Sequence, residues 1–127
     1  MDRPIRVLIV EDNKVFREAL ELLLELRPEL DVVGSLDSGN GAAAVVSDLR
    51  PDVVLIDYRL PGQNGVEVTR KVVAGSPHVC VICLTASVTT REIEELEAAG
   101  AFACLPKDGD LDRIIATIQE AAATRCS

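Results

Sequence analysis

The sequence predicts a single α/β domain of (βα)5 type, with a doubly wound, five-stranded parallel sheet. Strand-like and helix-like segments alternate five times along the chain, which is the pattern of this fold class. Most strand-like segments are unbroken runs of Val, Ile and Leu, as in parallel strands buried on both faces. The length of 127 residues fits one domain, and 48% hydrophobic residues can supply its core. We assign residues 1–123 to this domain and residues 124–127 to a frayed tail.

The strands are expected where aliphatic residues cluster, at residues 5–10, 31–36, 52–57, 79–84 and 102–105. The connections between them are short, and each crossover should be right-handed.

The helices are expected between the strands, at residues 14–26, 39–49, 65–73, 89–99 and about 110–123. Asn13 is the N-cap expected for the first helix, and Gly100 ends the fourth. Asp110 or Gly109 lies near the cap of the last helix. The first helix carries the apolar stripe typical of a helix packed on a sheet, made of Val15, Ala19, Leu22, Leu23 and Leu26. The inward-facing residues of the last two helices are Ile93, Leu96, Leu111, Ile114, Ile115 and Ile118.

The charge and hydropathy of the chain restrict its location and partners. A net charge of -8 argues against a nucleic-acid surface, which needs clustered Lys and Arg, and suits a cation or a basic partner. The apolar run that follows Pro4 is too short for a signal peptide, and no stretch reaches the roughly 20 apolar residues of a membrane span. We therefore expect a cytoplasmic protein.

The four cysteines are expected to be reduced, and they are Cys80, Cys83, Cys104 and Cys126. Cys80 and Cys83 have the C-x-x-C spacing, but they lie in a predicted strand, where an odd offset puts two side chains on opposite faces. The chain also has a single histidine, His78, which we place in a surface loop. A zinc or redox site at the C-x-x-C is therefore not expected.

Functional side chains in open α/β sheets gather at the carboxyl ends of the strands. The first predicted strand delivers Glu11 and Asp12 there, and the third delivers Asp57. The fourth strand delivers Thr85, and the fifth is followed by Lys107. The expected site thus holds three carboxylates, a hydroxyl and an ammonium.

Each of these groups suits phosphoryl chemistry. Clustered carboxylates repel one another, and Mg²⁺ relieves that repulsion because it prefers oxygen ligands and accepts phosphate oxygens as well. A carboxylate can attack phosphorus to give an acyl phosphate. Lys107 can balance the charge of the phosphoryl group, and the Thr85 hydroxyl can donate to one of its oxygens.

These residues, in this order, resemble the receiver domain of bacterial two-component response regulators. The resemblance runs from Ile5 to about Ala123. The matching elements are Glu11-Asp12, Asp57 followed by Pro61, Gly62 and Gly65, Thr85-Ala86, and Lys107. The segment from Gly100 to Ile114, with Asp108 after the lysine, is most similar to receivers of the LuxR/FixJ (NarL-like) class.

The resemblance implies a flavodoxin-like sheet with strand order 2-1-3-4-5 and a role for each residue. Asp57 would accept a phosphoryl group from a sensor histidine kinase or a phosphotransfer protein. Asp12, Asp57 and the backbone carbonyl of Arg59 would hold Mg²⁺, with Glu11 acting directly or through water. Thr85 and Lys107 would bind the phosphoryl group and change the face formed by residues 85–108.

The implied protein is a switch that catalyses its own phosphorylation and dephosphorylation and is not a metabolic enzyme. Its output would be a DNA-binding domain that regulates transcription and is absent from this chain. The domain itself would bind no nucleic acid and no membrane, and phosphorylation could produce a homodimer.

The chain departs from the family pattern in its fifth strand. Receivers usually carry Tyr or Phe three residues before the lysine, a side chain that swings inward when the threonine moves, and this chain has Cys104 there. Phe102 lies two residues earlier, on the same face by strand period. Pro106 directly before Lys107 is also unusual. A proline there removes an N–H from the end of the strand.

Three alternatives stay open from the sequence. A stand-alone receiver would act by protein contacts alone, and a switch-defective pseudo-receiver would keep the fold, which Cys104 allows. An aspartate-nucleophile phosphatase fits less well, because such enzymes carry a second aspartate two residues after the nucleophile, where this chain has Arg59.

Overall fold

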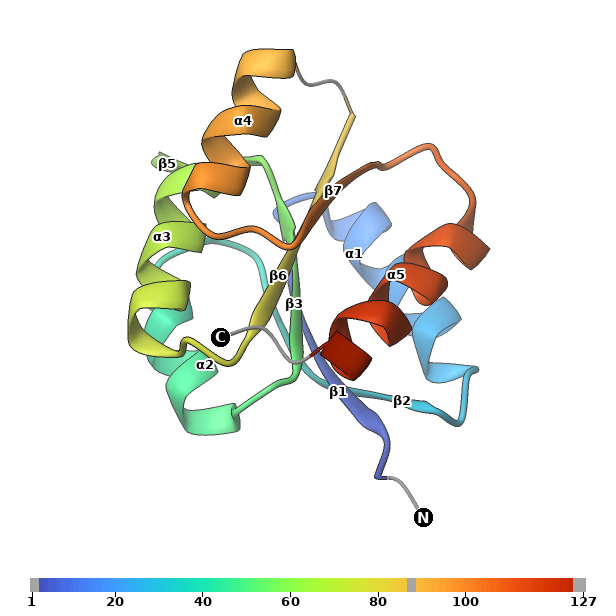
Figure 1. The fold of residues 1–127 in the computed structure, drawn as a ribbon. Coiled ribbons are helices and arrows are strands. Elements are labelled where there is room, and N and C mark those ends of the chain that lie inside the picture. The colour runs from blue at the N-terminus through green and yellow to red at the C-terminus, as the bar shows by residue number, and fades with distance from the viewer. Residues whose placement is uncertain (1–2, 87–88, 125–127) are drawn as a thin grey trace.

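The fold is that of a five-stranded parallel sheet covered by helices on both faces (Figure 1). A computed structural model describes residues 3–86 and 89–124. The sheet strands are β1 (Ile5–Val10), β2 (Leu30–Leu36), β3 (Val53–Asp57), β6 (Cys80–Thr85) and β7 (Ala103–Pro106). They lie in the order β2-β1-β3-β6-β7, which confirms the predicted order because β4 and β5 are outside this sheet.

The short strands β4 (Arg59–Leu60) and β5 (Gln63–Asn64) form a small antiparallel hairpin directly after β3. No strand was predicted between residues 57 and 65. Gly62 has a φ of 77°, a left-handed conformation that glycine adopts without strain, and this residue closes the hairpin.

The helices are α1 (Lys14–Glu25), α2 (Ala42–Leu49), α3 (Gly65–Gly75), α4 (Thr90–Ala98) and α5 (Leu111–Thr124). Figure 1 shows α2, α3 and α4 on one face of the sheet and α1 and α5 on the other. Asn13 caps α1 as predicted, with its side chain accepting from Phe16 N–H. Helix α5 continues through Thr124, the first residue of the predicted tail, and residues 125–127 lie outside the described part of the chain.

The two faces of the sheet carry separate cores, and the C-x-x-C cysteines are divided between them. Cys80 packs in the core under α1 and α5, whereas Cys83 packs in the core under α2, α3 and α4. The prediction of opposite faces is therefore confirmed. Cys83 and Cys104 are free thiols, but the expectation of reduced cysteines is wrong for Cys80, which is disulfide-bonded. Cys126 lies outside the described residues.

Helix α1 packs with a different side from the one predicted. Its buried residues are Leu20 and Leu24, while Leu22 is 67% exposed. The predicted stripe faces solvent at all five positions, Val15, Ala19, Leu22, Leu23 and Leu26. Leucines recur around much of this helix, so the period alone fits either side, and the contact with the sheet selects one.

A pair of alanine substitutions tests this orientation. Leu24→Ala should lower the free energy of unfolding by about 2–5 kcal/mol, because it leaves a cavity at a fully buried position. Leu22→Ala should change it by no more than about 0.5 kcal/mol, because that side chain is exposed. Urea unfolding of the two variants measures both values, and equal losses would contradict the described packing.

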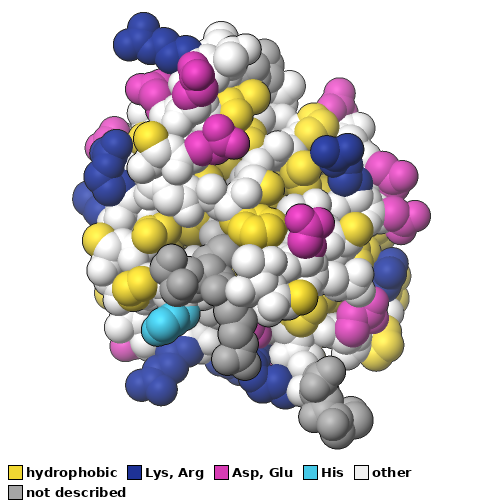
Figure 2. All heavy atoms as spheres, viewed as in Figure 1, with side chains coloured by type: hydrophobic (Ala, Val, Ile, Leu, Met, Phe, Trp, Pro, Cys, Tyr) yellow, Lys and Arg dark blue, Asp and Glu magenta, His cyan; other side chains and the backbone are white. Residues whose placement is uncertain are grey.

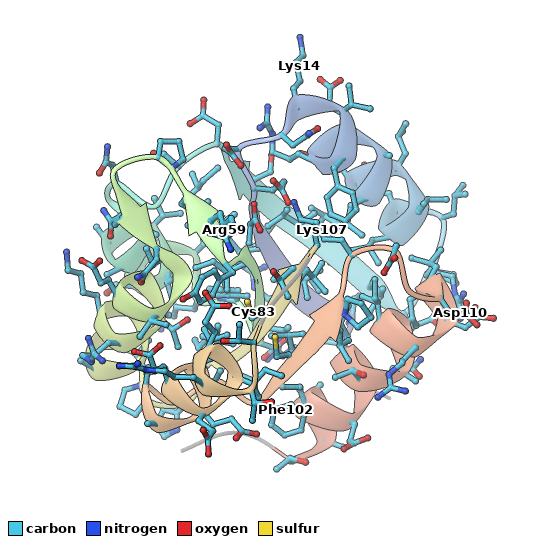
Figure 3. All side chains as sticks on the ribbon, turned by 90° about the horizontal axis from the view of Figure 1, so that it is seen from above. Lys14, Arg59, Cys83, Phe102, Lys107 and Asp110 are labelled. Atoms are coloured by element: carbon cyan, nitrogen blue, oxygen red, sulfur yellow. The ribbon has the colours of Figure 1, made fainter. Side chains whose placement is uncertain are left out.

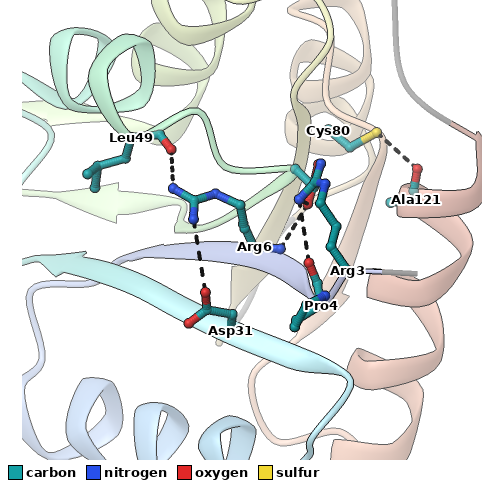
Figure 4. Close-up of polar contacts among 8 residues, drawn as sticks. Arg3, Pro4, Arg6, Asp31, Leu49, Cys80 and Ala121 are labelled. Carbon is teal, nitrogen blue, oxygen red and sulfur yellow. Dashed lines mark hydrogen bonds and ion pairs between the residues drawn. The ribbon is translucent and has the colours of Figure 1, made fainter. Parts of the chain in front are cut away.

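Arg3 and Arg6 make polar contacts at the amino ends of the strands (Figure 4). Arg3 pairs with Asp52 at 2.7 Å, and Asp52 also accepts from the backbone N–H of Arg6 at 2.9 Å. The Arg6 guanidinium donates to the carbonyl of Leu49 at 2.5 Å. These contacts join β1 to the segment before β3, at the opposite end of that strand from Asp57.

Candidate functional site

Three carboxylates converge where β1 and β3 end. Glu11 and Asp12 follow β1, and Asp57 is the last residue of β3. Each offers a carboxylate oxygen, and these oxygens all lie within 4.8 Å of one another. Glu11 is 2% exposed and Asp57 is 7% exposed, while Asp12 faces solvent. The predicted acidic pocket is therefore present, with two of its members withdrawn from water.

Lys107 supplies a cation to this pocket from the loop after β7 (Figure 3). Its Nζ lies 2.7 Å from Glu11 Oε1 and 3.2 Å from Asp57 Oδ2. The ammonium also lies over the ring of Phe16, 4.8 Å from the centroid, on the first turn of α1. Burial alone would lower the pKa of Lys107, but the hydrogen bond to Glu11 and the charge of Asp57 outweigh it and raise that pKa.

Glu11 is held in place by contacts on both sides. Its Oε2 accepts from the backbone N–H of Asn13 at 2.9 Å, and its carbonyl accepts from Arg17 at 2.8 Å. Burial raises the pKa of Glu11 above its ordinary value, although the hydrogen bonds from Lys107 and Asn13 act against that rise. The buried carboxylate is thus fixed by a cation and a peptide dipole together.

Thr85 stands beside the pocket on the neighbouring strand. It is the last residue of β6, 3% exposed, and Asp57 is the register partner of Leu84, one residue earlier. The Thr85 carbonyl accepts from the backbone N–H of Lys107 at 2.8 Å. This hydrogen bond links the backbone of Thr85 to that of Lys107. It forms one residue beyond Pro106, which has no N–H to donate.

Gly65 allows the hairpin to fold back close to the end of β3. A Cβ added there would lie 2.9 Å from Tyr58 Cα and 3.0 Å from the Asp57 carbonyl oxygen, both of them backbone atoms. Gly65 N–H donates to the Tyr58 carbonyl at 2.6 Å, and Arg59 N–H lies 3.4 Å from Asp57 Oδ1. A side chain at position 65 would therefore push directly on the segment that holds the Asp57 carboxylate.

A matched pair of glycine substitutions measures this constraint. Gly65→Ala should lower the free energy of unfolding by about 1–3 kcal/mol, since backbone must shift to admit the methyl group. Gly75→Ala should cost less than about 0.5 kcal/mol, since nothing lies within 4 Å of the added Cβ. Denaturant unfolding of both variants checks the difference, and an unchanged Gly65→Ala protein would refute the contact.

The position expected to hold a swinging aromatic ring holds a thiol. Cys104 is half-buried on β7 and packs against the core under α2, α3 and α4. Phe102 precedes β7 and packs against the opposite core, under α1 and α5. The expectation that Phe102 shares the face of Cys104 is therefore wrong, because strand alternation does not extend beyond the end of the strand. Phe102 is not a substitute for the missing ring.

The donor set fits a hard divalent cation. Three carboxylates close together, one on an exposed residue and two on buried residues, match the preference of Mg²⁺ for a few carboxylates with room left for water. The ammonium of Lys107 already balances part of the same charge.

Some of the predicted site residues lie in direct contact in the structure, and others do not. Glu11, Asp12, Asp57 and Lys107 form one contact group, and Thr85 joins it through strand pairing and its carbonyl. The Arg59 guanidinium lies over the Tyr58 ring, 5.6 Å from its centroid. His78 is exposed in the turn before β6, as expected (Figure 2).

Sequence reasoning missed three residues that shape the pocket, Asn13, Phe16 and Arg17. All three lie just after the acidic pair, at the start of α1, where the helix begins beside the strand ends. Their closeness in sequence to Asp12 was the available signal. The contact between Phe16 and Lys107 had no local signal, because the two residues are far apart in the chain.

Comparisons with known proteins point the same way as this geometry. The family model described as the response regulator receiver domain matches residues 7–119. The transcriptional regulatory protein LnrK of Bacillus subtilis (strain 168) is 38% identical over 114 residues, covering 90% of this chain and 52% of that protein. A protein-glutamate methylesterase/protein-glutamine glutaminase of Syntrophus aciditrophicus (strain SB) is 41% identical over 105 residues, covering 81% of this chain and 30% of that protein.

Among solved structures, the signal receiver domain of the response regulator NarL from Mycobacterium tuberculosis superimposes with a TM-score of 0.91 and 29% identity. That match covers 98% of this chain and 100% of the other. The resemblance to LuxR- and NarL-type regulators is thereby confirmed. The chain spans about half the length of LnrK, and less of the methylesterase. From the fold, the site and these matches, this chain belongs to the response regulator receiver domain family.

Proposed function

We propose that Asp57 is the phosphoacceptor of this receiver domain. Receiver domains of two-component response regulators are phosphorylatable signalling switches, and this chain has the fold and sequence of one. The observation that carries the residue assignment is the contact group at the strand ends, where Lys107 contacts Asp57 within a cluster of three carboxylates. Asp57 is the last residue of β3, the strand that lies between β1 and β6.

The residues would divide the work as follows. An Asp57 carboxylate oxygen attacks phosphorus and forms an acyl phosphate. Lys107, already 3.2 Å from Asp57, meets the charge of the added phosphoryl oxygens, and the Thr85 hydroxyl donates to one of them. Glu11, Asp12, Asp57 and the carbonyl of Arg59 would hold Mg²⁺, which supplies charge neutralisation for the phosphoryl group. The same residues would position water for the loss of the phosphoryl group.

The partners follow from the family. The phosphoryl group would come from a sensor histidine kinase or a phosphotransfer protein in the cytoplasm, and the output would be transcriptional control through a DNA-binding domain. Among the described residues, no helix is long and apolar enough to cross a membrane. The exposed leucines of α1 support a protein–protein contact, with the kinase or with a second copy of the chain. A receiver domain over residues 1–123 would contain the matched range of 7–119.

A switch-defective receiver is the second candidate, and Cys104 favours it. A small thiol in place of an aromatic ring offers less volume to move when Thr85 shifts. Such a protein would still accept a phosphoryl group at Asp57, but its 85–108 face would respond weakly.

Intact-mass spectrometry tests the proposal. The chain is incubated with acetyl phosphate, first with Mg²⁺ and then with EDTA in its place. A gain of one phosphoryl mass that requires Mg²⁺ is the expected result, whereas no gain in Mg²⁺ would overturn the assignment. Amide hydrogen exchange over residues 85–108, with and without phosphorylation, then separates the working switch from the defective one.

A further inference from the structure

Two free thiols, those of Cys83 and Cys104, lie opposite each other on the neighbouring strands β6 and β7, next to the site. Cys83 on β6 and Cys104 on β7 are register partners in the parallel sheet. Side chains of register partners point to the same face, and both pack in the core under α2, α3 and α4. Neither thiol has a role in the chemistry assigned to Asp57.

We propose that Cys83 and Cys104 form a thiol-oxidation site that peroxides convert into an internal disulfide. Neighbouring parallel strands lie roughly 4.7–4.9 Å apart, and a disulfide needs Cα atoms about 4.4–6.8 Å apart. The Cβ atoms must come to about 4 Å, which requires a small approach of the two strands. Strand β7 can make that approach because it is a short strand at the edge of the sheet, next to β6.

The two thiols differ in the way that an attacking and a resolving cysteine differ. Cys104 is half-buried, so a small oxidant can reach it, whereas Cys83 is 0% exposed. A hydrogen bond from Cys83 lowers the pKa of Cys104, and the same bond, with burial, raises the pKa of Cys83. The thiolate is the reactive form of cysteine, so Cys104 is the first to react.

The reaction balances with a peroxide as the only oxidant. The Cys104 thiolate attacks one peroxide oxygen, the O–O bond breaks, and the protonated leaving group departs as water or an alcohol, leaving a sulfenic acid. The Cys83 sulfur then attacks the Cys104 sulfur, the S–O bond breaks, and the thiol proton of Cys83 leaves with the hydroxyl as water. Two electrons pass from the two thiols to the peroxide.

The product would join the strands that carry Thr85 and Lys107. Cys83 lies two residues before Thr85, and Cys104 lies three residues before Lys107. Any sliding between β6 and β7 at the site would then be blocked by a covalent bond. The chemistry of the thiols needs neither phosphate nor Mg²⁺, so its test stands apart from that of the proposed function.

The test uses the full chain with Cys80→Ser and Cys126→Ser, which leaves Cys83 and Cys104 as the only thiols. After full reduction, hydrogen peroxide should lower the intact mass by two hydrogens, and dithiothreitol should restore it. Trypsin should then release residues 72–91 and 92–107 as one disulfide-linked species. Adding Cys104→Ser is the matched control, which should abolish the loss of mass and leave the Cys83 thiol at least about tenfold slower to react.

Several outcomes would overturn the proposal: two free thiols after peroxide treatment, sulfinic acid in place of the disulfide, or dimers linked between chains. The unaltered chain provides a second measurement if the serine variants fail to fold. There, the reduced protein is treated with peroxide, and one alkylating reagent is applied before renewed reduction and an isotopically heavy one after it. Heavy label at both Cys83 and Cys104 supports the proposal, and light label at either refutes it.

Discussion

Asp57→Asn is expected to abolish the uptake of a phosphoryl group from acetyl phosphate in the presence of Mg²⁺. An amide oxygen is a far weaker nucleophile toward phosphorus than a carboxylate, and the amide also removes one anionic ligand from the pocket. Lys107 contacts both Glu11 and Asp57, and Asp57 is the one of these two that ends β3. Intact mass, followed over the period in which the unaltered chain is fully labelled, measures the effect.

Asp108→Asn is the matched control for this substitution. Asp108 is exposed and directly follows Lys107, so it shares the neighbourhood of the site without belonging to the contact group. Phosphoryl uptake should be unchanged in that variant. A full gain of mass in Asp57→Asn would show that another residue is the acceptor, and circular dichroism establishes that both variants are folded.

Lys107→Met is expected to lower the free energy of unfolding by about 2–3 kcal/mol in the absence of Mg²⁺. Removing one partner of a buried ion pair costs about 3–5 kcal/mol, and the partial exposure of the ammonium places this case lower. The side chain of Lys107 is 18% exposed, against 3% for Glu11 and 8% for Asp57. Two nearly buried carboxylates would lose their shared cation, and Mg²⁺ should reduce the cost because it neutralises the same charge.

The cost of Lys107→Met should also grow with pH. Burial raises the pKa of Glu11 in the folded chain above its ordinary value of 4.5. Because the pKa of Glu11 is higher in the folded chain than in the unfolded chain, protonation of Glu11 stabilises the folded chain. This stabilisation is complete below pH 4.5 and is lost as the pH rises through the pKa of the folded chain. Without the ammonium that pKa rises further, so the penalty of an ionised Glu11 increases toward neutral pH.

Urea unfolding between pH 4 and pH 7.5, with EDTA or with Mg²⁺, checks both parts of this expectation. Lys71→Met is the control, because Lys71 is exposed on α3 and should show a change of no more than about 0.5 kcal/mol. A stability of Lys107→Met equal to that of the control, at neutral pH without Mg²⁺, would contradict the described ion pairs.

The features that could be predicted from the sequence are those that depend on residues close together in the chain. The aliphatic run from Val53 to Ile56 predicts a strand by itself, and the capping residue Asn13 predicts where α1 begins. The acids and Lys107 were identified because the ends of parallel strands share one edge of the sheet, so their order along the chain was sufficient. The hairpin of β4 and β5 was missed because two-residue strands leave no periodic signal.

The sequence by itself determined the fold class, the strand order through the family resemblance, and which acids and lysine follow the carboxyl ends of the strands. Only the tertiary structure decided which side of α1 is buried, that Phe102 and Cys104 face opposite cores, and that Cys83 and Cys104 are neighbours. It likewise decided that Lys107 contacts Glu11 as well as Asp57. The physical reason is that such contacts depend on the register between elements distant in the chain, which packing sets and no local period encodes.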